Sequence, residues 1–354
     1  MLFVNARFLT QELTGVQRFA EQISLSLNVI RDDLIFLCPP GGLRDNVAKE
    51  LQVREIGSKG GHLWEQIELP NYLKKNGSGL LLNLGSTAPV FYKNQIVTHH
   101  DVTYKRYPKS FSKKFRAIYG ILVPMMLKNS NKLLTVSEFS KNEISEIYGH
   151  SKENIEIIYN AVSNSFNKTS ERDFSKPYLL AVSSPNFHKN FHGMLRAFEL
   201  LGDKYDISLK IIGKTATSFS KQDFSSLIKN SNKIQFLGRV DDDEMISLYQ
   251  NACAFVFPSF YEGFGIPPLE AQSCGCPVIS SNMASMPEVL RDSAIYFDPH
   301  NEKEMASVME KIILDGDLRA ELVRRGDENI KRFSWDDSAK KVSQIVDKIL
   351  ANKK

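Results

Sequence analysis

The sequence predicts an α/β protein built from two doubly wound halves, each a parallel sheet covered by helices. Short apolar runs such as Leu80–Leu82 and Ile96–Thr98 have the length of buried strands, and they alternate with stretches of helical periodicity. The alternation stops in the polar stretch 163–176, the best linker candidate, and begins again at Tyr178. A chain of 354 residues has room for two domains of ordinary size.

The first half is expected to begin with a strand over Leu2–Phe8 and a polar loop over Thr10–Gly15. A helix follows, and its apolar positions are Val16, Phe19, Ala20, Ile23 and Leu27. Further strands are expected at Leu34–Leu37, Leu80–Leu82, Ile96–Thr98, Leu133–Val136 and Ile155–Tyr159. Ser140 and Glu143 have the spacing of a capping box for one more helix. The stretch 41–78 is polar and glycine-bearing, and it predicts no element.

The second half repeats the alternation. Strands are expected at Tyr178–Val182, Ile207–Ile212, Lys233–Leu237 and Ala254–Phe257. Asp241 and Glu244 have capping-box spacing, so we interpret them as a helix start and not as a metal site. The last helix, at about Asp336–Leu350, has one apolar face and therefore needs a packing partner.

Composition and charge are those of an ordinary globular protein. The 45 basic and 41 acidic residues leave a net charge of +4, which argues against nucleic-acid binding driven by overall charge. The N-terminus lacks the basic start and long apolar core of a signal peptide, and no apolar run has transmembrane length. The four cysteines form no C-x-x-C pair. We therefore expect a cytoplasmic protein with reduced cysteines and no structural zinc.

The stretch Phe255–Pro277 carries the clearest chemical signal. A buried strand stops at Pro258, a loop with two glycines follows, and two prolines stand where a helix begins. Glycine allows a backbone to approach a ligand closely, and a helix start favours a phosphate. Glu262 and Glu270 bracket this loop, and carboxylates accept hydrogen bonds from sugar hydroxyls. The alternative interpretation is an ordinary strand–loop–helix connection.

The run Glu262–Glu270 resembles the E-x7-E signature of the retaining glycosyltransferases of family 4, which have the GT-B fold. The resemblance covers nearly the whole chain and is strongest from Tyr178 to Pro299. It implies two Rossmann-like domains that face each other across a cleft, with the C-terminal helix crossing back to the first domain. Residues 1–168 with 336–354 would form the acceptor-side domain, and 169–335 would bind a nucleotide sugar.

The resemblance also implies roles in a donor site. Glu262 would hold hexose hydroxyls and Glu270 ribose hydroxyls. Backbone groups of Gly263, Phe264, Gly265 and Ile266 would bind hexose and phosphate. His100, in the pair His100-Asp101, is similar to the histidine that contacts the donor sugar, and His99 would be a packing residue.

Three further segments resemble donor-binding elements of the family. Gly15 lies in a loop that would approach the donor phosphates, and Arg239 and Val240 stand where the family's backbone meets the nucleotide base. The motif from Ser183 to Asn190 is similar to a phosphate clamp, with Lys189 in the lysine position. It departs from the family in two places. Ser183 stands where an arginine is common, and His188 replaces a second basic residue. Arg18 or Arg239 would then supply the missing charge.

The segment from Val102 to Ser137 contains no acidic residue. Its basic residues are Lys105, Arg106, Lys109, Lys113, Lys114, Arg116, Lys128 and Lys132, and aromatic residues lie between them. One interpretation is a solvated helix face. The other is a surface over residues 104–132 that touches an anionic membrane or an anionic acceptor. Nucleic acid would also use such residues, but nothing else in the sequence supports it.

Taken together, the resemblance implies a retaining, metal-independent glycosyltransferase. It would move a hexose from a nucleotide-diphosphate sugar to a saccharide or lipid-linked saccharide in bacterial surface polysaccharide synthesis, at the inner face of the cell membrane. GDP-mannose is the expected donor, because the opening "TGVQRFAEQI" is similar to bacterial mannosyltransferases. No cofactor is expected. The alternatives are a nucleotide-sugar epimerase, a phosphorylase on the same fold, or a catalytically weak nucleotide-sugar-binding protein.

Overall fold

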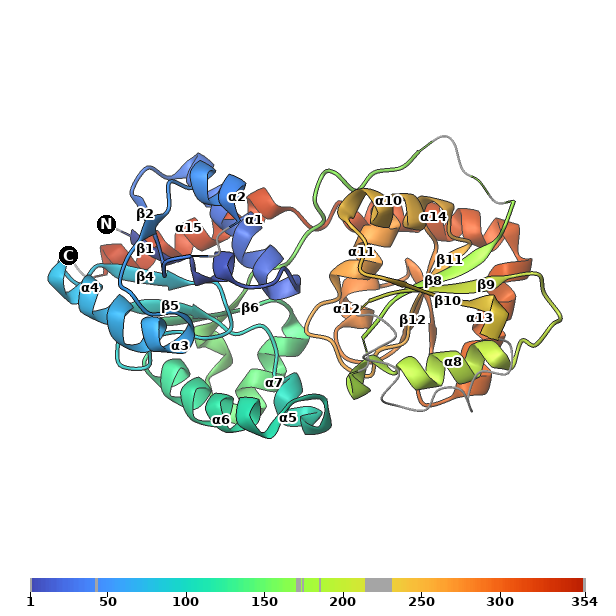
Figure 1. The fold of residues 1–354 in the computed structure, drawn as a ribbon, viewed down its shortest axis with the longest axis horizontal. Helices are drawn as coiled ribbons and strands as arrows, with labels where there is room; N and C mark the ends of the chain where they lie inside the picture. Colours follow the sequence, from blue (N-terminus) through green and yellow to red (C-terminus); the bar gives the residue numbers. More distant parts are fainter. Residues whose placement is uncertain are drawn as a thin grey trace. The chain divides into compact units, whose positions relative to one another are not determined.

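The computed structural model describes residues 2–41, 44–169, 173, 175–184, 186–213 and 231–352, so part of the predicted linker 163–176 and Pro185 of the clamp motif lie outside the described residues. The chain divides into two compact units (Figure 1). The first unit comprises Met1–Val102, Ser112–Asn160 and Ser334–Lys354, and the second comprises Thr103–Phe111 and Ala161–Phe333. No helix in the described part of the chain combines the length and hydropathy that a membrane span requires.

The first unit contains a seven-stranded sheet in the order β3-β2-β1-β4-β5-β6-β7, and every neighbouring pair is parallel. The strands are β1 (Leu2–Asn5), β2 (Leu34–Cys38), β3 (Arg54–Glu55), β4 (Leu80–Asn83), β5 (Gln95–Thr98), β6 (Lys132–Thr135) and β7 (Ile155–Ile157). The strand order reverses between β1 and β4. In open parallel sheets, ligands bind at the carboxyl ends of the strands beside such a reversal.

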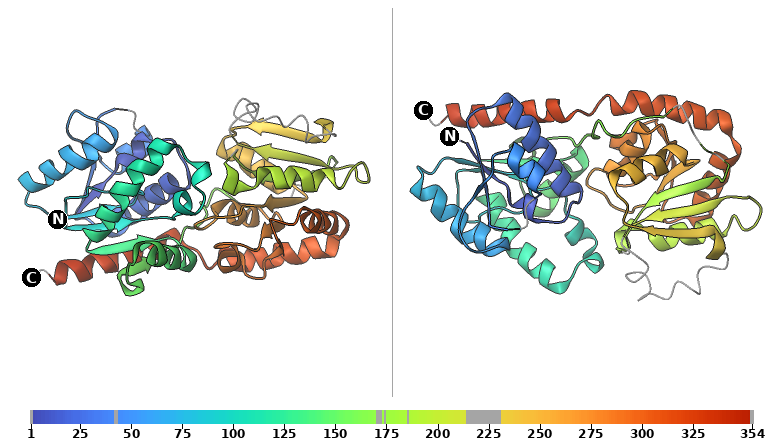
Figure 2. Two further views of the ribbon diagram at one scale, coloured as in Figure 1. Left: turned by 90° about the horizontal axis from the view of Figure 1, so that it is seen from below. Right: turned by 45° about the horizontal axis from the view of Figure 1, so that its top comes forward.

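Helices flank this sheet in Figure 1. They are α1 (Gly15–Ile30), α2 (Asp45–Glu50), α3 (Gly61–Leu63), α4 (Leu69–Lys75), α6 (Lys113–Lys128), α7 (Glu138–Tyr148) and α15 (Trp335–Ala351), with short turns η1 (Arg7–Thr10), η2 (Trp64–Glu68) and η4 (Lys152–Asn154). The terminal helix α15 packs against α1 (Figure 2) and buries its apolar face there. The ring of Trp335 meets that of Phe19 edge-on. The C-terminal helix therefore belongs to the first unit, as the resemblance implies.

Three predictions for the first unit were wrong in detail, and one of them is the strand expected over Ile155–Tyr159, which ends at Ile157. The strand expected over Leu2–Phe8 ends at Asn5, because the chain turns into η1 at Arg7. The cap of α7 is Ser137 and not Ser140, since the Ser137 hydroxyl accepts the hydrogen bond of the Ser140 amide at 3.0 Å.

The stretch 41–78, for which the sequence predicts no element, contains α2, β3 and a continuous helical run from α3 through η2 to α4. Because η2 is a π-turn, it shifts the apolar spacing away from the 3.6-residue period by which a helix is recognised. Trp64, at the start of η2, is fully buried. The helical run therefore packs as a core element although its sequence lacks the helical pattern.

The second unit contains a six-stranded parallel sheet in the order β10-β9-β8-β11-β12-β13. The strands are β8 (Tyr178–Val182), β9 (Ser208–Ile212), β10 (Ile234–Gly238), β11 (Ala254–Phe257), β12 (Val278–Ser281) and β13 (Ala294–Phe297). The helices are α5 (Thr103–Arg106), α8 (Phe191–Glu199), α10 (Asp242–Asn251), α11 (Ile266–Ser273), α12 (Met286–Leu290), α13 (Glu302–Leu314) and α14 (Gly316–Ile330), with turns η3 (Pro108–Ser110), η5 (Phe187–Lys189) and η6 (Ser231–Lys233). Its order reverses between β8 and β11, so both units are doubly wound.

Candidate functional site

The loop between β11 and α11 has the geometry that its glycines and prolines predict. Gly265 has a φ of +94°, which strains any residue with a side chain, and a Cβ atom there would also lie 2.5 Å from the Cε of Met286, so the backbone favours glycine at this position. Helix α11 begins at Ile266 with prolines in its first turn and has no side-chain cap. The Ser285 hydroxyl donates to the carbonyls of Glu262 (2.9 Å) and Phe264 (3.1 Å), which holds the loop in place.

Lys189 and Glu262 form an ion pair beside this loop. The Nζ of Lys189 lies 2.5 Å from the Oε1 of Glu262, and the side chains are 27% and 14% exposed. Lys189 ends the turn η5, which follows β8, and Glu262 follows β11. The two strands that flank the reversal of the sheet thus bring an ammonium group and a carboxylate together. Both residues were predicted site residues, and their contact was not predicted.

Glu270 lies one turn into α11 and is 8% exposed. The hydroxyl of Tyr249, on α10, donates to its Oε2 at 3.4 Å. Burial, and then the charge of Glu270, raises the pKa of Tyr249 well above its usual value of about 10, so the phenol keeps its proton and its role as donor. Sequence analysis missed Tyr249, because a buried helical tyrosine has the pattern of any core residue.

The remaining predicted residues of the second unit follow strands β8 and β10, which are separated in the sheet by β9. Ser183 follows β8, is buried, and its amide donates to the carbonyl of Ile212 on β9 at 2.9 Å. Arg239 and Val240 follow β10, and Arg239 is exposed. Since all these strands are parallel, Ser183, Arg239 and Lys189 stand at the same edge of the sheet.

His188 has a different environment from the one expected of a phosphate-clamp residue. Its ring is buried, its Nδ1 lies 2.9 Å from the Oγ of Ser110, and it stacks on Phe111 at a centroid distance of 6.1 Å. Both partners belong to the segment Thr103–Phe111, which joins the second unit although it lies in the first half of the chain. The His188 ring therefore fastens this segment beside Lys189.

In the first unit, His99 and His100 follow β5 and are both buried. The Nε2 of His100 lies 3.0 Å from the carbonyl of Leu84, and a carbonyl only accepts, so we assign the proton to Nε2. Burial lowers the pKa of both histidines, which leaves them neutral at physiological pH. His99 packs edge-on against Tyr148. Gly15, also in this unit, is the first residue of α1, and that helix start likewise has no side-chain cap.

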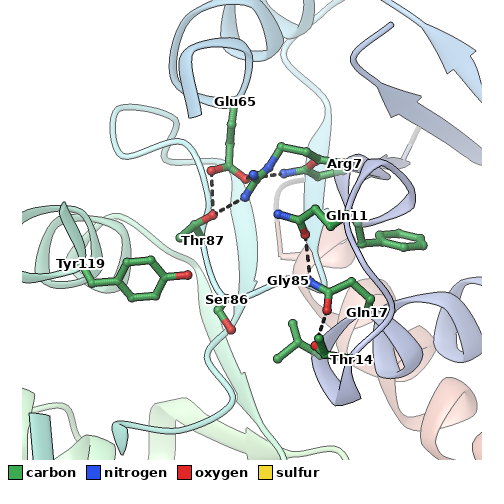
Figure 3. A pocket seen from close by; sticks show the side chains of 12 residues that line it. Arg7, Gln11, Thr14, Gln17, Glu65, Gly85, Ser86, Thr87 and Tyr119 are labelled. Atoms are coloured by element: carbon green, nitrogen blue, oxygen red, sulfur yellow. Dashed lines mark hydrogen bonds and ion pairs between the residues drawn. The ribbon is translucent and has the colours of Figure 1, made fainter. Parts of the chain in front are cut away.

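A small polar cavity of about 120 Å³ lies in the first unit (Figure 3). Its lining residues are Asn5, Arg7, Phe8, Gln11, Thr14, Val16, Gln17, Glu65, Gly85, Ser86, Thr87 and Tyr119. The Nε of Arg7 lies 3.1 Å from the Oε1 of Glu65, and Thr87 bridges the pair by accepting from Arg7 and donating to Glu65, both at 2.7 Å. Sequence analysis missed Arg7, Glu65 and Thr87, because they come from three segments without a motif.

Within the described ranges, no group of three or more His, Cys, Asp or Glu side chains could hold a metal ion. All four cysteines are buried thiols, and none of them forms a disulfide. The described residues of the candidate site therefore offer an ammonium group, carboxylates, neutral imidazoles and uncapped helix N-termini.

Comparison with known proteins agrees with this geometry. The profile "Glycosyl transferases group 1" matches residues 163–329, and "Glycosyltransferase Family 4" matches residues 83–166. The O-antigen chain mannosyltransferase RfbU of Salmonella typhimurium is 32% identical over 283 residues, which are 80% of this chain and 76% of that protein. The O-antigen chain mannosyltransferase B of Escherichia coli is 29% identical over 266 residues, 70% of each chain.

Solved structures show the same fold. Sucrose-phosphate synthase from Thermosynechococcus elongatus superimposes with a TM-score of 0.76 at 15% identity and covers 99% of both chains. The two doubly wound sheets, the returning terminal helix and the matched profiles have one explanation: the chain belongs to family 4 of the glycosyltransferases, the glycosyl transferases of group 1, and is a glycosyltransferase of the GT-B type.

Proposed function

We propose that the chain is a retaining, metal-independent hexosyltransferase that moves mannose from GDP-mannose to a saccharide or lipid-linked saccharide. The observation that carries the proposal is the Lys189–Glu262 pair at the uncapped start of α11. An ammonium group and a helix start suit a diphosphate, and the adjoining carboxylate suits sugar hydroxyls. The mannosyltransferase names of the two relatives support the choice of sugar.

In this proposal the second unit binds the donor and the first binds the acceptor. Lys189 and the amides of Gly265 and Ile266 neutralise the charge that grows on the leaving diphosphate, and such electrostatic stabilisation is usually the largest catalytic contribution. Glu262 accepts from hexose hydroxyls, and Glu270, oriented by Tyr249, accepts from ribose hydroxyls.

The ion pair also describes how the donor would enter. A diphosphate would draw the Nζ of Lys189 away from Glu262, and a hexose hydroxyl would replace the ammonium group as the donor to that carboxylate. Both charges keep a partner through the exchange, so neither is left buried alone. His100, whose Nε2 proton is held by the carbonyl of Leu84, would orient the sugar by accepting a hydrogen bond at Nδ1, and Gly15 and Arg239 would complete the phosphate and base contacts.

Polysaccharide synthesis at the inner face of the membrane is the proposed setting, as the relatives' names suggest. Helix α6 supports a peripheral contact with anionic lipid. Its Lys113, Lys114, Arg116 and Lys128 are exposed, and so is Ile121, at 64%. Cations beside an exposed apolar side chain are typical of helices that rest on a membrane surface. Co-sedimentation with vesicles that contain phosphatidylglycerol, and not with neutral vesicles, would support this contact.

Release of GDP from GDP-mannose tests the proposal. We expect release only when a mannose-terminated oligosaccharide is added, at a rate that EDTA leaves unchanged, with a product whose new linkage has the α-configuration of the donor. Release that depends on EDTA-sensitive metal, or a product of β-configuration, would contradict it. A donor epimerised without acceptor would favour an epimerase. Tight binding without turnover would favour a binding protein, an alternative that Ser183 at the arginine position keeps open.

A further inference from the structure

The cavity of the first unit lies where the fold itself creates a binding position. Asn5 ends β1 and Asn83 ends β4, the two strands between which the order of the sheet reverses. The lining residues Arg7 and Thr87 follow these strands within a few positions. Ligands of open parallel sheets bind beside the carboxyl ends of strands at such a reversal. The cavity is therefore the natural ligand site of this unit.

The floor of the cavity is a buried polar network. Asn5 donates to Glu65 at 3.1 Å and to Asn83 at 3.0 Å, and Arg7 and Thr87 hold the two oxygens of Glu65. The Glu65 side chain is 1% exposed and that of Arg7 is 11% exposed. Burying such an ion pair is expensive compared with an apolar core. If the floor of the cavity had only a structural role, apolar side chains could fill it and the Arg7–Glu65 ion pair would not be needed.

The charges of the cavity cancel. Among the described residues that line it, Arg7 and Glu65 are the only charged ones, and they pair with each other. The other polar side chains are amides and hydroxyls: Asn5, Gln11, Thr14, Gln17, Ser86, Thr87 and Tyr119. A phosphate or carboxylate would lose its hydration without finding an unpaired cation here. A neutral ligand with many hydroxyl groups would match the amides and hydroxyls one by one.

The wall that faces the start of α1 can adapt to such a ligand. The Nε2 of Gln17 donates to the Oε1 of Gln11 at 2.9 Å, and Thr14 hydrogen-bonds to Gln17. In Figure 3 the hydroxyl of Tyr119 points into the same space from the opposite side. Burial raises the pKa of Tyr119 to about 12, so its phenol remains protonated and can both donate and accept. Sugar hydroxyls can exchange with these amide contacts at little cost, since the side chains are partly exposed.

Size and position narrow the ligand further. About 120 Å³ is well above the roughly 15 Å³ that one water requires and below the roughly 300 Å³ at which drug-sized sites begin. A space of this size suits one sugar ring better than a whole nucleotide. Its residues Thr14, Val16 and Gln17 flank Gly15, the residue expected to approach the donor phosphates. A sugar bound here would lie beside that loop.

We propose that this cavity binds the terminal, uncharged hexose of the acceptor, with Gln11, Gln17 and Tyr119 hydrogen-bonding to its hydroxyls. The inference rests on the proposed function and extends it by naming the acceptor class: a neutral hexose, in contrast to a uronic acid, a sugar phosphate or a bare lipid phosphate. Arg7 and Glu65 act as positioning residues that hold the floor.

The experiment has a binding arm and a kinetic arm, both with the full chain. In the binding arm, saturation-transfer NMR compares methyl α-D-mannopyranoside with mannose 6-phosphate, glucuronate and inorganic phosphate. We expect transfer to the neutral glycoside, and its loss in the double variant Gln11→Ala/Gln17→Ala. Preferred binding of any of the three anions would overturn the assignment, and so would equal transfer in wild type and double variant. This arm needs no turnover, so it stands if the proposed donor is wrong.

In the kinetic arm, the double variant should raise the acceptor KM about tenfold, since two hydrogen bonds are lost, while the donor KM rises less than twofold. Tyr119→Phe should raise the acceptor KM by a smaller factor. Gln22→Ala, on the same helix but outside the cavity, is the matched control and should leave both constants unchanged. If the wild-type enzyme is active and the double variant has an unchanged acceptor KM, the assignment of the acceptor hexose to this cavity is wrong and the proposed function still stands. If wild type transfers no sugar at all, the proposed function itself is contradicted.

Discussion

At the scale of single residues, the burial of a charged side chain determines whether its substitution mainly affects stability or activity. Glu65 is fully buried against Arg7, whereas Lys189 and Glu262 remain partly exposed. The first pair should matter mainly for stability and the second mainly for activity, because removing one partner of a buried pair leaves an uncompensated charge in the protein interior, whereas exposed pairs contribute little to folding.

Glu65→Gln should lower the free energy of unfolding by about 3 kcal/mol at pH 7, since Arg7 loses its counter-charge. Urea unfolding measures this, with Glu50→Gln, an exposed residue at the end of α2, as the control that changes little. A Glu65→Gln variant as stable as wild type would show that the ion pair does not stabilise the first unit.

The same glutamate predicts a pH dependence. Burial tends to raise the pKa of Glu65, but the charge of Arg7 and hydrogen bonds from His62 and Thr87 outweigh it and hold the pKa at about 2. Because the folded pKa is below the unfolded value of about 4.3, this stabilisation is complete above pH 4.3 and is lost as the pH falls towards 2. When the pH falls from 6 to 3, the free energy of unfolding should decrease by about 2 kcal/mol more in wild type than in Glu65→Gln. Parallel pH profiles would contradict this.

Lys189→Met should lower kcat/KM about 100-fold or more, because it removes a charge that stabilises the leaving diphosphate. Its stability should fall by about 1 kcal/mol, less than that of Glu65→Gln, because the Lys189–Glu262 pair is only partly buried. Lys204, which pairs with Glu310 on the surface of the same unit, offers a matched control, and Lys204→Met should keep wild-type kinetics. Equal activity of the two variants would remove Lys189 from the site.

At the scale of elements, local rules predicted the starts of α10 and α11 in the second unit well. The prolines of α11 lie in its first turn, and Asp241 caps α10 by accepting from the amide of Glu244 at 2.9 Å. Both signals are local, so no tertiary contact is needed to recognise them. The run from α3 to α4 was not predicted, since its π-turn removes the period on which recognition depends.

Gly265→Ala should destabilise the second unit by about 1–3 kcal/mol, because alanine tolerates a φ of +94° poorly and its Cβ would collide with Met286. Gly120→Ala provides the contrast. That residue lies within α6 with no atom near the added Cβ, so alanine should stabilise the protein by about 0.5–1 kcal/mol. Thermal or urea unfolding of both variants measures the difference, and two effects of the same sign would contradict the assigned geometry.

At the scale of the whole molecule, the fold and the loop between β11 and α11 could be predicted, and the cavity of the first unit could not. The motif from Glu262 to Glu270 is contiguous, so its residues are near each other in any fold. Glu65 lies more than fifty positions after Arg7, and Thr87 lies more than twenty positions after Glu65. The three side chains meet only because β1 and β4 are neighbours in the sheet. The sequence also could not predict that Thr103–Phe111 belongs to the second unit, because only tertiary contacts with His188 reveal it.

A donor screen by thermal shift tests the central claim most directly. Wild type, Glu270→Ala and the control Glu288→Ala, at a nearby partly exposed glutamate, would each be heated with GDP-mannose, GDP-fucose, UDP-glucose, UDP-N-acetylglucosamine and UDP-galactose. We predict that GDP-mannose raises the melting temperature of wild type and of the control, and that Glu270→Ala loses the shift. A larger shift with another donor would replace GDP-mannose in the proposal. A shift that survives in Glu270→Ala, or none with any donor, would contradict a nucleotide-sugar site at the start of α11.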